Sequence, residues 1–151
     1  MAGVAYTLES RSLDQALTGL ARWSGSIAAR RLALAGAVGA VVESSTRRRI
    51  ADEKTAPDGT PWAPWSAAHG ATRRPGQSIL QGENDLLDSV QALSSAAEVQ
   101  VGSNLVYAAI HQMGGEDVGK NIPARPYLGV SAADERDIRD LAADFLFGGL
   151  S

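Results

Sequence analysis

Few residues of this 151-residue chain have side chains suited to catalysis or metal binding. Cysteine is absent, which excludes disulfides, thiolate metal sites and cysteine nucleophiles. The two histidines, His69 and His111, belong to neither a His-x-x-x-His nor a Glu-x-x-His pair, the spacings that place two ligands on one helix face. The sequence therefore predicts no metal and no other cofactor.

The sequence also gives little support for a serine nucleophile. No serine lies in a Gly-x-Ser-x-Gly elbow, and Gly102-Ser103, which follows an expected strand, is more simply a turn. The acidic residues after position 131 alternate with arginines, as on a solvated helix face rather than between the walls of a catalytic cleft. We therefore expect no enzymatic activity and keep a hydrolase acting through His111 as an alternative.

The cluster Arg47-Arg48-Arg49 has three roles open to it. Neighbouring helical residues point about 100° apart, so the three arginines cannot share one face. They fit the negative end of a long helix, a contact with DNA phosphate, or a contact with acids of a neighbouring subunit. The formal net charge of −3 argues against a general polyanion binder. A DNA-contacting packaging or connector factor that uses Arg47, Arg48 and Arg49 is the alternative function.

Residues 54–78 are predicted to form a long loop, because four prolines and three glycines fall in this stretch. A structureless segment of this length is uncommon inside a compact domain unless it has a function. It carries Trp62 and Trp65, and large aromatic side chains supply much of the binding energy of interfaces. We expect both tryptophans to anchor the loop on a partner, so that Trp62→Ala leaves a folded monomer that assembles poorly.

The first third of the sequence is predicted to be helical. A capping pattern begins at Ser12, Ser24-Gly25 is expected to break the chain, and a second, longer helix follows over 27–50. Gly36 and Gly39 lie among its apolar residues. Glycines weaken a helix but let another backbone approach closely, so we expect a neighbouring helix to pack there.

The second half of the chain alternates between short elements. We expect strands at 88–93 and 98–101, joined as a hairpin, because apolar and polar residues alternate there. A helix is expected over 105–113, and two prolines limit 122–130 to an edge strand or an irregular extended segment. A capping pattern at Ser131 begins a final helix with one apolar stripe.

The whole chain, residues 1–151, is predicted to be one domain of the α+β class. A small, mainly antiparallel sheet is packed by a long N-terminal helix, a middle helix and a C-terminal helix, and a β-prone stretch at 6–8 precedes them. With 26 alanines and 16 glycines, the core must be thin or completed by a partner. The most apolar run, 32–42, is shorter than the ~20 residues that span a membrane, so we expect a soluble, cytoplasmic protein.

Four blocks of sequence occur in order beyond the first helices. They are PDGTPWAP at 57–64, a leucine- and serine-containing block at 79–89, VQVGS followed by YAAIHQMG over 99–114, and IPARPYLG at 122–129. This series resembles the phage virion morphogenesis (tail-completion) family of Mu-like phages. Relatives commonly have glycine where this sequence has Asn84, and asparagine tolerates left-handed backbone angles better than other non-glycine residues.

The resemblance implies a structural protein of the phage tail or head–tail junction. Such proteins commonly form rings, often of six subunits, around the DNA channel, and they bind other neck or tail proteins such as a tail tube or connector. The resemblance also implies synthesis in the host cytoplasm, followed by incorporation into the virion. Non-specific contact with DNA in the channel stays open, and no membrane partner is expected.

Individual residues follow from the same resemblance. Arg125, Pro126 and Tyr127 are expected at a subunit interface, where two rigid prolines would hold Arg125 ready for a neighbour's carboxylate or backbone carbonyls. His111 is favoured as an intrachain lock on that segment. The residues expected to form the structural motif are Asn84, Leu86, Ser89, Tyr107, His111 and Gln112.

Overall fold

The computed structural model describes residues 10–147, so the stretch at 6–8 lies outside the described residues. The elements in chain order are α1 (Ser10–Arg48), a π-helical turn η1 (Arg49–Glu53), α2 (Ala67–Gly70), α3 (Asp85–Ser89), β1 (Gln91–Ser94), β2 (Val99–Gly102), α4 (Ala108–Met113), a 3-10 turn η2 (Glu116–Val118) and α5 (Ala132–Phe147). The expected α+β class, with a long N-terminal helix and a small antiparallel sheet, is confirmed.

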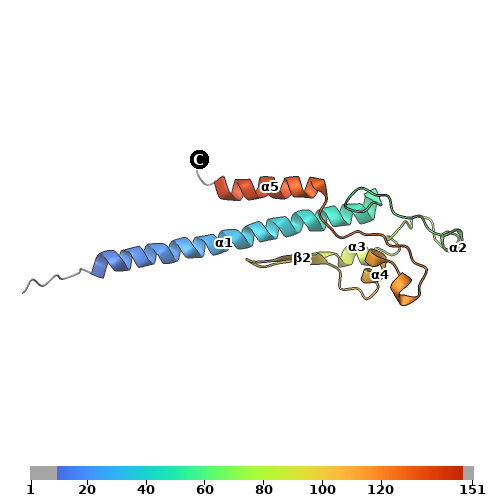
Figure 1. Cartoon of the computed structure of the whole chain (residues 1–151), viewed down its shortest axis with the longest axis horizontal. Coiled ribbons are helices and arrows are strands. Elements are labelled where there is room, and N and C mark those ends of the chain that lie inside the picture. The colour runs from blue at the N-terminus through green and yellow to red at the C-terminus, as the bar shows by residue number, and fades with distance from the viewer. Residues whose placement is uncertain (1–9, 148–151) are drawn as a thin grey trace, which may run out of the picture.

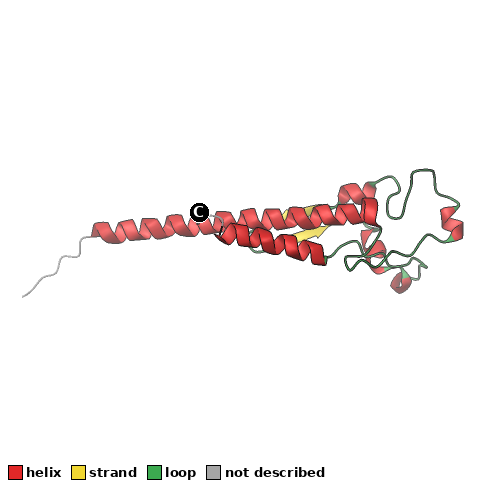
Figure 2. Cartoon of the chain, turned by 90° about the horizontal axis from the view of Figure 1, so that it is seen from above, coloured by secondary structure: helices red, strands yellow, loops and turns green. Residues whose placement is uncertain are grey.

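The long helix α1 sets the shape of the molecule (Figure 1). α5 lies along one side of its C-terminal half, and the β1–β2 hairpin lies along the other. Seen from above, the long loops gather where α1 ends, whereas the first part of α1 extends past every other described element (Figure 2).

α1 is one continuous helix of 39 residues, so the break expected at Ser24-Gly25 is wrong. A glycine inside a helix costs roughly 1 kcal/mol relative to alanine, and the alanines, leucines and arginines on both sides offset that cost. The helix ends in the turn η1. There Lys54 adopts left-handed angles, with φ of 56°, and its N–H donates to the Arg49 carbonyl at 2.9 Å.

β1 and β2 pair antiparallel, with Gln91 opposite Gly102. The expected second strand is confirmed to within a residue. The expected strand at 88–93 is right only in its second half, because the chain is still helical through Ser89 and pairing begins at Gln91.

The hairpin packs on α1 at Gly39. A Cβ at this position would lie 2.9 Å from Ser94 Oγ and 3.1 Å from Ala92 Cβ. The close approach expected of the glycines therefore occurs at Gly39, but the neighbour is the hairpin rather than a helix. At Gly36 a Cβ would meet nothing within 4 Å, so this glycine faces open space in the described part of the chain.

Alanine substitution at these two glycines is expected to have opposite effects. Gly36→Ala adds helix propensity without a steric contact and should stabilise the chain by up to about 1 kcal/mol. Gly39→Ala gains the same propensity but forces Ala92 away, and overpacking of this kind costs about 1–3 kcal/mol. Urea unfolding should therefore place Gly39→Ala below Gly36→Ala in stability. Equal stability of the two variants would contradict this packing.

The final helix begins as predicted, with a reciprocal capping pair. Ser131 Oγ accepts the N–H of Asp134 at 3.1 Å, and an Asp134 carboxylate oxygen accepts the N–H of Ser131 at 2.8 Å. Ile138, Leu141 and Phe145 are half-buried, as expected of an apolar stripe on a helix that packs against α1. α4 begins only at Ala108, three residues later than expected, and 122–130 is extended without a strand partner among the described residues.

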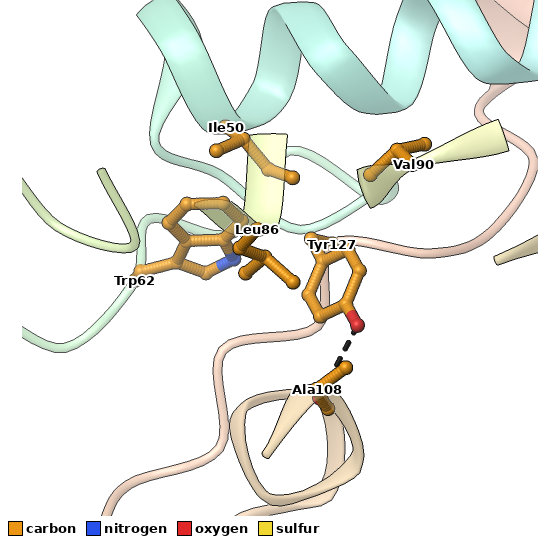
Figure 3. Packing of buried hydrophobic residues seen from close by; sticks show 6 residues of the cluster. All are labelled: Ile50, Trp62, Leu86, Val90, Ala108 and Tyr127. Atoms are coloured by element: carbon orange, nitrogen blue, oxygen red, sulfur yellow. Dashed lines mark hydrogen bonds between the residues drawn. The ribbon is translucent and has the colours of Figure 1, made fainter. Parts of the chain in front are cut away.

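The buried core is small and lies at the end of α1 (Figure 3). Ile50 contributes from η1, Val90 from the start of the hairpin, and Trp62 and Tyr127 from loops. The six buried hydrophobic residues of the cluster are Ile50, Trp62, Leu86, Val90, Ala108 and Tyr127. The aromatic side chains of Trp62 and Tyr127, both from irregular segments, therefore fill much of a core that has few aliphatic residues.

One helix in the described chain, over Leu17–Glu53, is long and apolar enough to cross a membrane by length and composition alone. Its mean hydropathy reaches 1.4 in the most apolar window. Of the residues in that window, 6% are buried within the described chain. The C-terminal end of the stretch packs into the protein, because Ile50 belongs to the core and Arg49 forms a buried ion pair.

Candidate functional site

The proline-rich loop is fixed to the chain's own IPARPY segment. The Arg125 guanidinium donates to the carbonyls of Ala63 and Pro64 at 2.9 and 3.1 Å, and the indole N–H of Trp62 donates to the carbonyl of Pro126 at 2.9 Å. Prolines supply no N–H donors, so such a loop depends on side chains to satisfy its carbonyls. Arg125 does bind backbone carbonyls, as expected, but those of its own subunit.

The roles expected for Trp62, Arg125 and Tyr127 at a subunit interface do not fit their positions. Trp62 and Arg125 are each only 6% exposed, and Tyr127 is 1% exposed. Their polar atoms are already used within the chain, since the Tyr127 hydroxyl donates to the Ala108 carbonyl at 3.2 Å. Pro126 is half-buried beside them. The segment resembles an interface motif in sequence but serves as an internal clamp.

Gln112 of α4 holds the other side of the same segment. Its side-chain oxygen accepts the N–H groups of Tyr127 and Leu128, both at 3.0 Å, and its amide donates to the Leu128 carbonyl at 3.2 Å. The carbonyl of His111 accepts the N–H of Arg125 at 2.7 Å. Both residues therefore act within the subunit, His111 through its backbone.

Arg49 lies at the centre of a buried polar cluster that joins three parts of the chain. Its guanidinium pairs with the Asp134 carboxylate at 2.6 Å and donates to the Tyr127 carbonyl at 2.8 Å. Ser45 donates to the same carboxylate at 2.8 Å and accepts from Arg49 at 2.6 Å. Arg49, Asp134, Ser45 and the Tyr127 carbonyl are called the polar node below.

The carboxyl of Asp134 stays ionised in this node. Burial opposes ionisation, but hydrogen bonds from Ser131 and Ser45 and the charge of Arg49 outweigh it and hold the pKa below its ordinary value. Both side chains of the ion pair are 2% exposed. Arg49 therefore cannot reach DNA or an acid of another subunit, and that interpretation of it is wrong.

The other two arginines of the cluster also bind within the chain. Arg47 donates to the Val90 carbonyl at 2.7 Å and pairs with Glu43 at 3.2 Å. Arg48 pairs with Glu53 at 2.6 Å and is half exposed. Since the three arginines point in different directions, as expected, each has a separate partner and they form no common basic face.

Asn84 and the residues after it shape the start of the hairpin. Asn84 adopts left-handed angles, with φ of 70° and ψ of 3°, and precedes α3, in which Leu86 is 3% exposed. Ser89 Oγ donates to the Leu86 carbonyl at 2.8 Å and lies 2.7 Å from Ser103 Oγ. Asparagine thus takes the backbone conformation that glycine would take in relatives.

A cleft of about 300 Å³ lies between the proline-rich loop and α4. Trp65 is half-buried there, with His69 edge-on to it at 5.8 Å, and Tyr107 stands edge-on to His111 at the same separation. Burial, together with the charge of Arg125, lowers the pKa of His111, so this histidine is neutral at pH 7. Among residues 10–147, no group of three His, Asp or Glu side chains is placed to hold a metal ion.

Several large apolar side chains are exposed on the first part of α1. Every described side chain from Gln15 to Ser26 is exposed, including Leu17, Leu20 and Trp23 at 55, 60 and 64%. We call residues 15–27 the arm. Sequence reasoning did not single it out, although the spacing of Leu20 and Ile27 by seven residues indicates a single apolar face.

The sequence profile of the phage virion morphogenesis family matches residues 8–146, from the arm to the end of α5. The chain belongs to this family. Its role is accordingly in the assembly of a phage virion.

Two relatives of this virion morphogenesis protein come from Mu and a Mu-like prophage. It is 33% identical over 120 residues to a protein of Escherichia phage Mu described as putative capsid assembly protein G, covering 74% of this chain and 76% of that protein. It is 40% identical over 76 residues to the Mu-like prophage FluMu G protein 2 of Haemophilus influenzae, covering 48% of this chain and 54% of that protein. No solved structure matches.

In this member of the virion morphogenesis family, the four sequence blocks make contacts inside the chain. The blocks that carry the resemblance position Trp62, Arg125 and Gln112 for internal contacts. The matched region also includes the arm, in which the described side chains from Gln15 to Ser26 are exposed.

Proposed function

We propose that this protein completes the tail or the head–tail junction of a tailed phage by forming a homo-oligomeric ring around the DNA channel. We take the ring as hexameric, with a tail tube or connector protein bound to it. Assembly takes place in the host cytoplasm before the protein enters the virion. The protein acts without catalysis, a cofactor or a membrane.

The observation that carries this proposal is the exposed apolar arm. Soluble monomers seldom leave Leu17, Leu20 and Trp23 together in water, and contiguous apolar surface of this kind marks a site for a protein partner. The family and the printed description of the Mu relative, putative capsid assembly protein G, both concern assembly. An exposed helix that protrudes beyond the core is suited to reach a neighbouring subunit.

The ring model predicts a defined mass in solution. Sedimentation velocity of the full chain, over a concentration series, is expected to show a discrete oligomer that is an integral multiple of 15.7 kDa, and the same oligomer should be present in phage particles. Deleting the arm should reduce particle incorporation at least tenfold. A chain that is strictly monomeric and absent from particles would contradict the proposal.

The alternative, a DNA-contacting factor that uses Arg47, Arg48 and Arg49, loses support from the geometry. Arg49 is buried, and the more exposed Arg47 and Arg48 are paired with Glu43 and Glu53. Each phosphate contact adds about 0.9 to the slope of log affinity against log salt concentration. We expect a shallow slope for the wild-type chain that does not change in Arg48→Ala; a steep slope that falls in this variant would favour the DNA-contacting role.

A further inference from the structure

The arm prolongs a face of α1 that is already used for packing inside the subunit. Leu20, Ile27, Leu34 and Val41 follow one another at intervals of seven, which places them on one side of a helix. Leu34 and Val41 are half-buried, whereas Leu20 is 60% exposed. In Figure 1 the first part of α1 extends past the described parts of α5 and the hairpin. The apolar face therefore continues from the packed part of α1 into the arm, where Leu20 is no longer covered by α5 or the hairpin.

Charge distinguishes the arm from the helix beside it. Between Gln15 and Val42, α1 carries Arg22, Arg30 and Arg31 and no acidic residue. None of these arginines forms an ion pair within residues 10–147, whereas the arginines at the end of α1 do. The arm therefore offers unpaired positive charge beside exposed apolar side chains.

The outer face of α5 has the opposite charge. The helix holds five acidic residues and two arginines. Asp137, Asp140 and Asp144 are exposed, form no ion pair in the described chain, and are spaced three and four residues apart, so they line one side of the helix. Of the two arginines, Arg139 is paired with Glu135 and only Arg136 remains unpaired.

An apolar hollow lies between α1 and the end of α5. It has a volume of about 170 Å³ and is lined by Ile27, Arg30, Arg31 and Leu34 of α1 and by Phe145, which follows Asp144 of the stripe. Interfaces are commonly anchored by an aromatic side chain seated in such a hollow. The hollow can receive an apolar or aromatic side chain, and the acidic stripe can pair with an arginine.

We propose that the arm of each subunit docks on α5 of the next copy in the ring, with Trp23 in the hollow and Arg22 against the Asp137–Asp144 stripe. This inference rests on the proposed ring. Two different faces meet in such a contact, and head-to-tail contacts of that kind close into rings when the rotation per subunit allows it. Pairing of two arms would leave Arg22 without an acidic partner, because residues 15–27 contain no acidic residue.

Cysteine cross-linking tests which surfaces meet, and the absence of native cysteines makes single-site labelling direct. Ser24→Cys places a thiol on the exposed arm, and Ala143→Cys places one on the exposed side of α5. Mixing the two variants under mild oxidation should give one disulfide-linked dimer containing both chains. Ala97→Cys, at the exposed hairpin turn, is the matched control and should not react with Ser24→Cys.

Each other result overturns the arm–α5 contact. A Ser24→Cys dimer formed without Ala143→Cys would indicate that two arms pair, and the lack of any mixed dimer would show that the surfaces do not meet. If the wild-type chain nevertheless forms rings and enters particles, the proposed function stands and only this contact fails. Flotation with phosphatidylcholine vesicles that is lost in Trp23→Ala would assign the arm to a lipid surface instead.

Charge exchange tests the same contact by mass. Arg22→Glu is expected to weaken association at least tenfold, and combination with Asp144→Arg should restore most of it, because the opposite charges meet again. Trp23→Ala should weaken association by a similar factor, whereas Leu93→Ala, at an equally exposed leucine of the hairpin, should not. Failure of the double charge variant to recover would contradict the proposed pairing.

Discussion

Asp134→Asn is expected to lower the free energy of unfolding by about 3–5 kcal/mol, because it leaves the Arg49 guanidinium buried without its counter-charge. The ion pair measures 2.6 Å and each side chain is 2% exposed. Arg49 keeps its hydrogen bonds to Ser45 and to the Tyr127 carbonyl, but neutral acceptors do not balance a buried charge. Urea unfolding of the full chain, followed by far-ultraviolet circular dichroism, measures this loss.

Asp117→Asn is the matched control, at an aspartate outside the proposed contact. Asp117 is exposed, so its removal should change stability by no more than about 0.5 kcal/mol. Replacing both members of the pair, as Arg49→Met with Asp134→Leu, should recover much of the loss, since apolar pairs often substitute for buried ion pairs at little cost. A single Asp134→Asn variant within 1 kcal/mol of wild type, by the same measurement, would show that the node contributes little.

The node also sets a pH dependence. Because the pKa of Asp134 is depressed in the folded chain, its contribution to stability is fully present above the unfolded carboxyl pKa of about 3.9. The contribution is lost as the pH falls through the lower folded pKa, when the carboxyl takes up a proton and Arg49 loses its partner. Stability measured from pH 6 downward should therefore fall more steeply for the wild type than for Asp134→Asn.

Local features of this fold follow from the sequence because they depend on residues close together in the chain. The capping pair at Ser131 and Asp134 spans three residues, and the β1–β2 hairpin is closed by a four-residue connection. Turn residues, the alternation of apolar and polar residues in strands, and helix caps can all be recognised over such short distances in the sequence. The same reasoning failed at Ser24-Gly25, where a local break signal was outweighed by the helical preference of the residues on both sides.

The contact partners of individual side chains could not be predicted in the same way. Arg49 reaches Tyr127 and Asp134 across 78 and 85 positions, and Trp62 reaches Pro126 across 64. An arginine cluster and a tryptophan-containing loop look alike in sequence whether they face solvent, a partner or the protein's own core. The chain also gave a positive signal that was passed over, since the arm's apolar spacing in a segment without acids marks a surface that a partner can cover.

Trp62→Ala is expected to cost about 3–5 kcal/mol of stability, rather than to leave a folded monomer as the loop composition first suggested. The indole packs among Ile50, Leu86 and Tyr127 in a core of few residues, and its N–H donates to the Pro126 carbonyl (Figure 3). Truncation therefore opens a cavity and leaves that carbonyl unsatisfied at the junction of loop and clamp. Thermal unfolding monitored by circular dichroism should show a large fall in Tm.

The same substitution at Trp23 separates folding from assembly, because the two tryptophans differ mainly in exposure, 6% against 64%. Trp23→Ala should leave Tm within a few degrees of wild type and lower the oligomer fraction. Trp62→Ala should instead lower Tm strongly, because its main effect is on folding rather than on association. If Trp62→Ala lost assembly at unchanged Tm, Trp62 would act at an exposed interface and not in the core. Opposite responses to one chemical change would show that the stability supplied by the buried clamp and the association supplied by the exposed helix are independent properties of the chain.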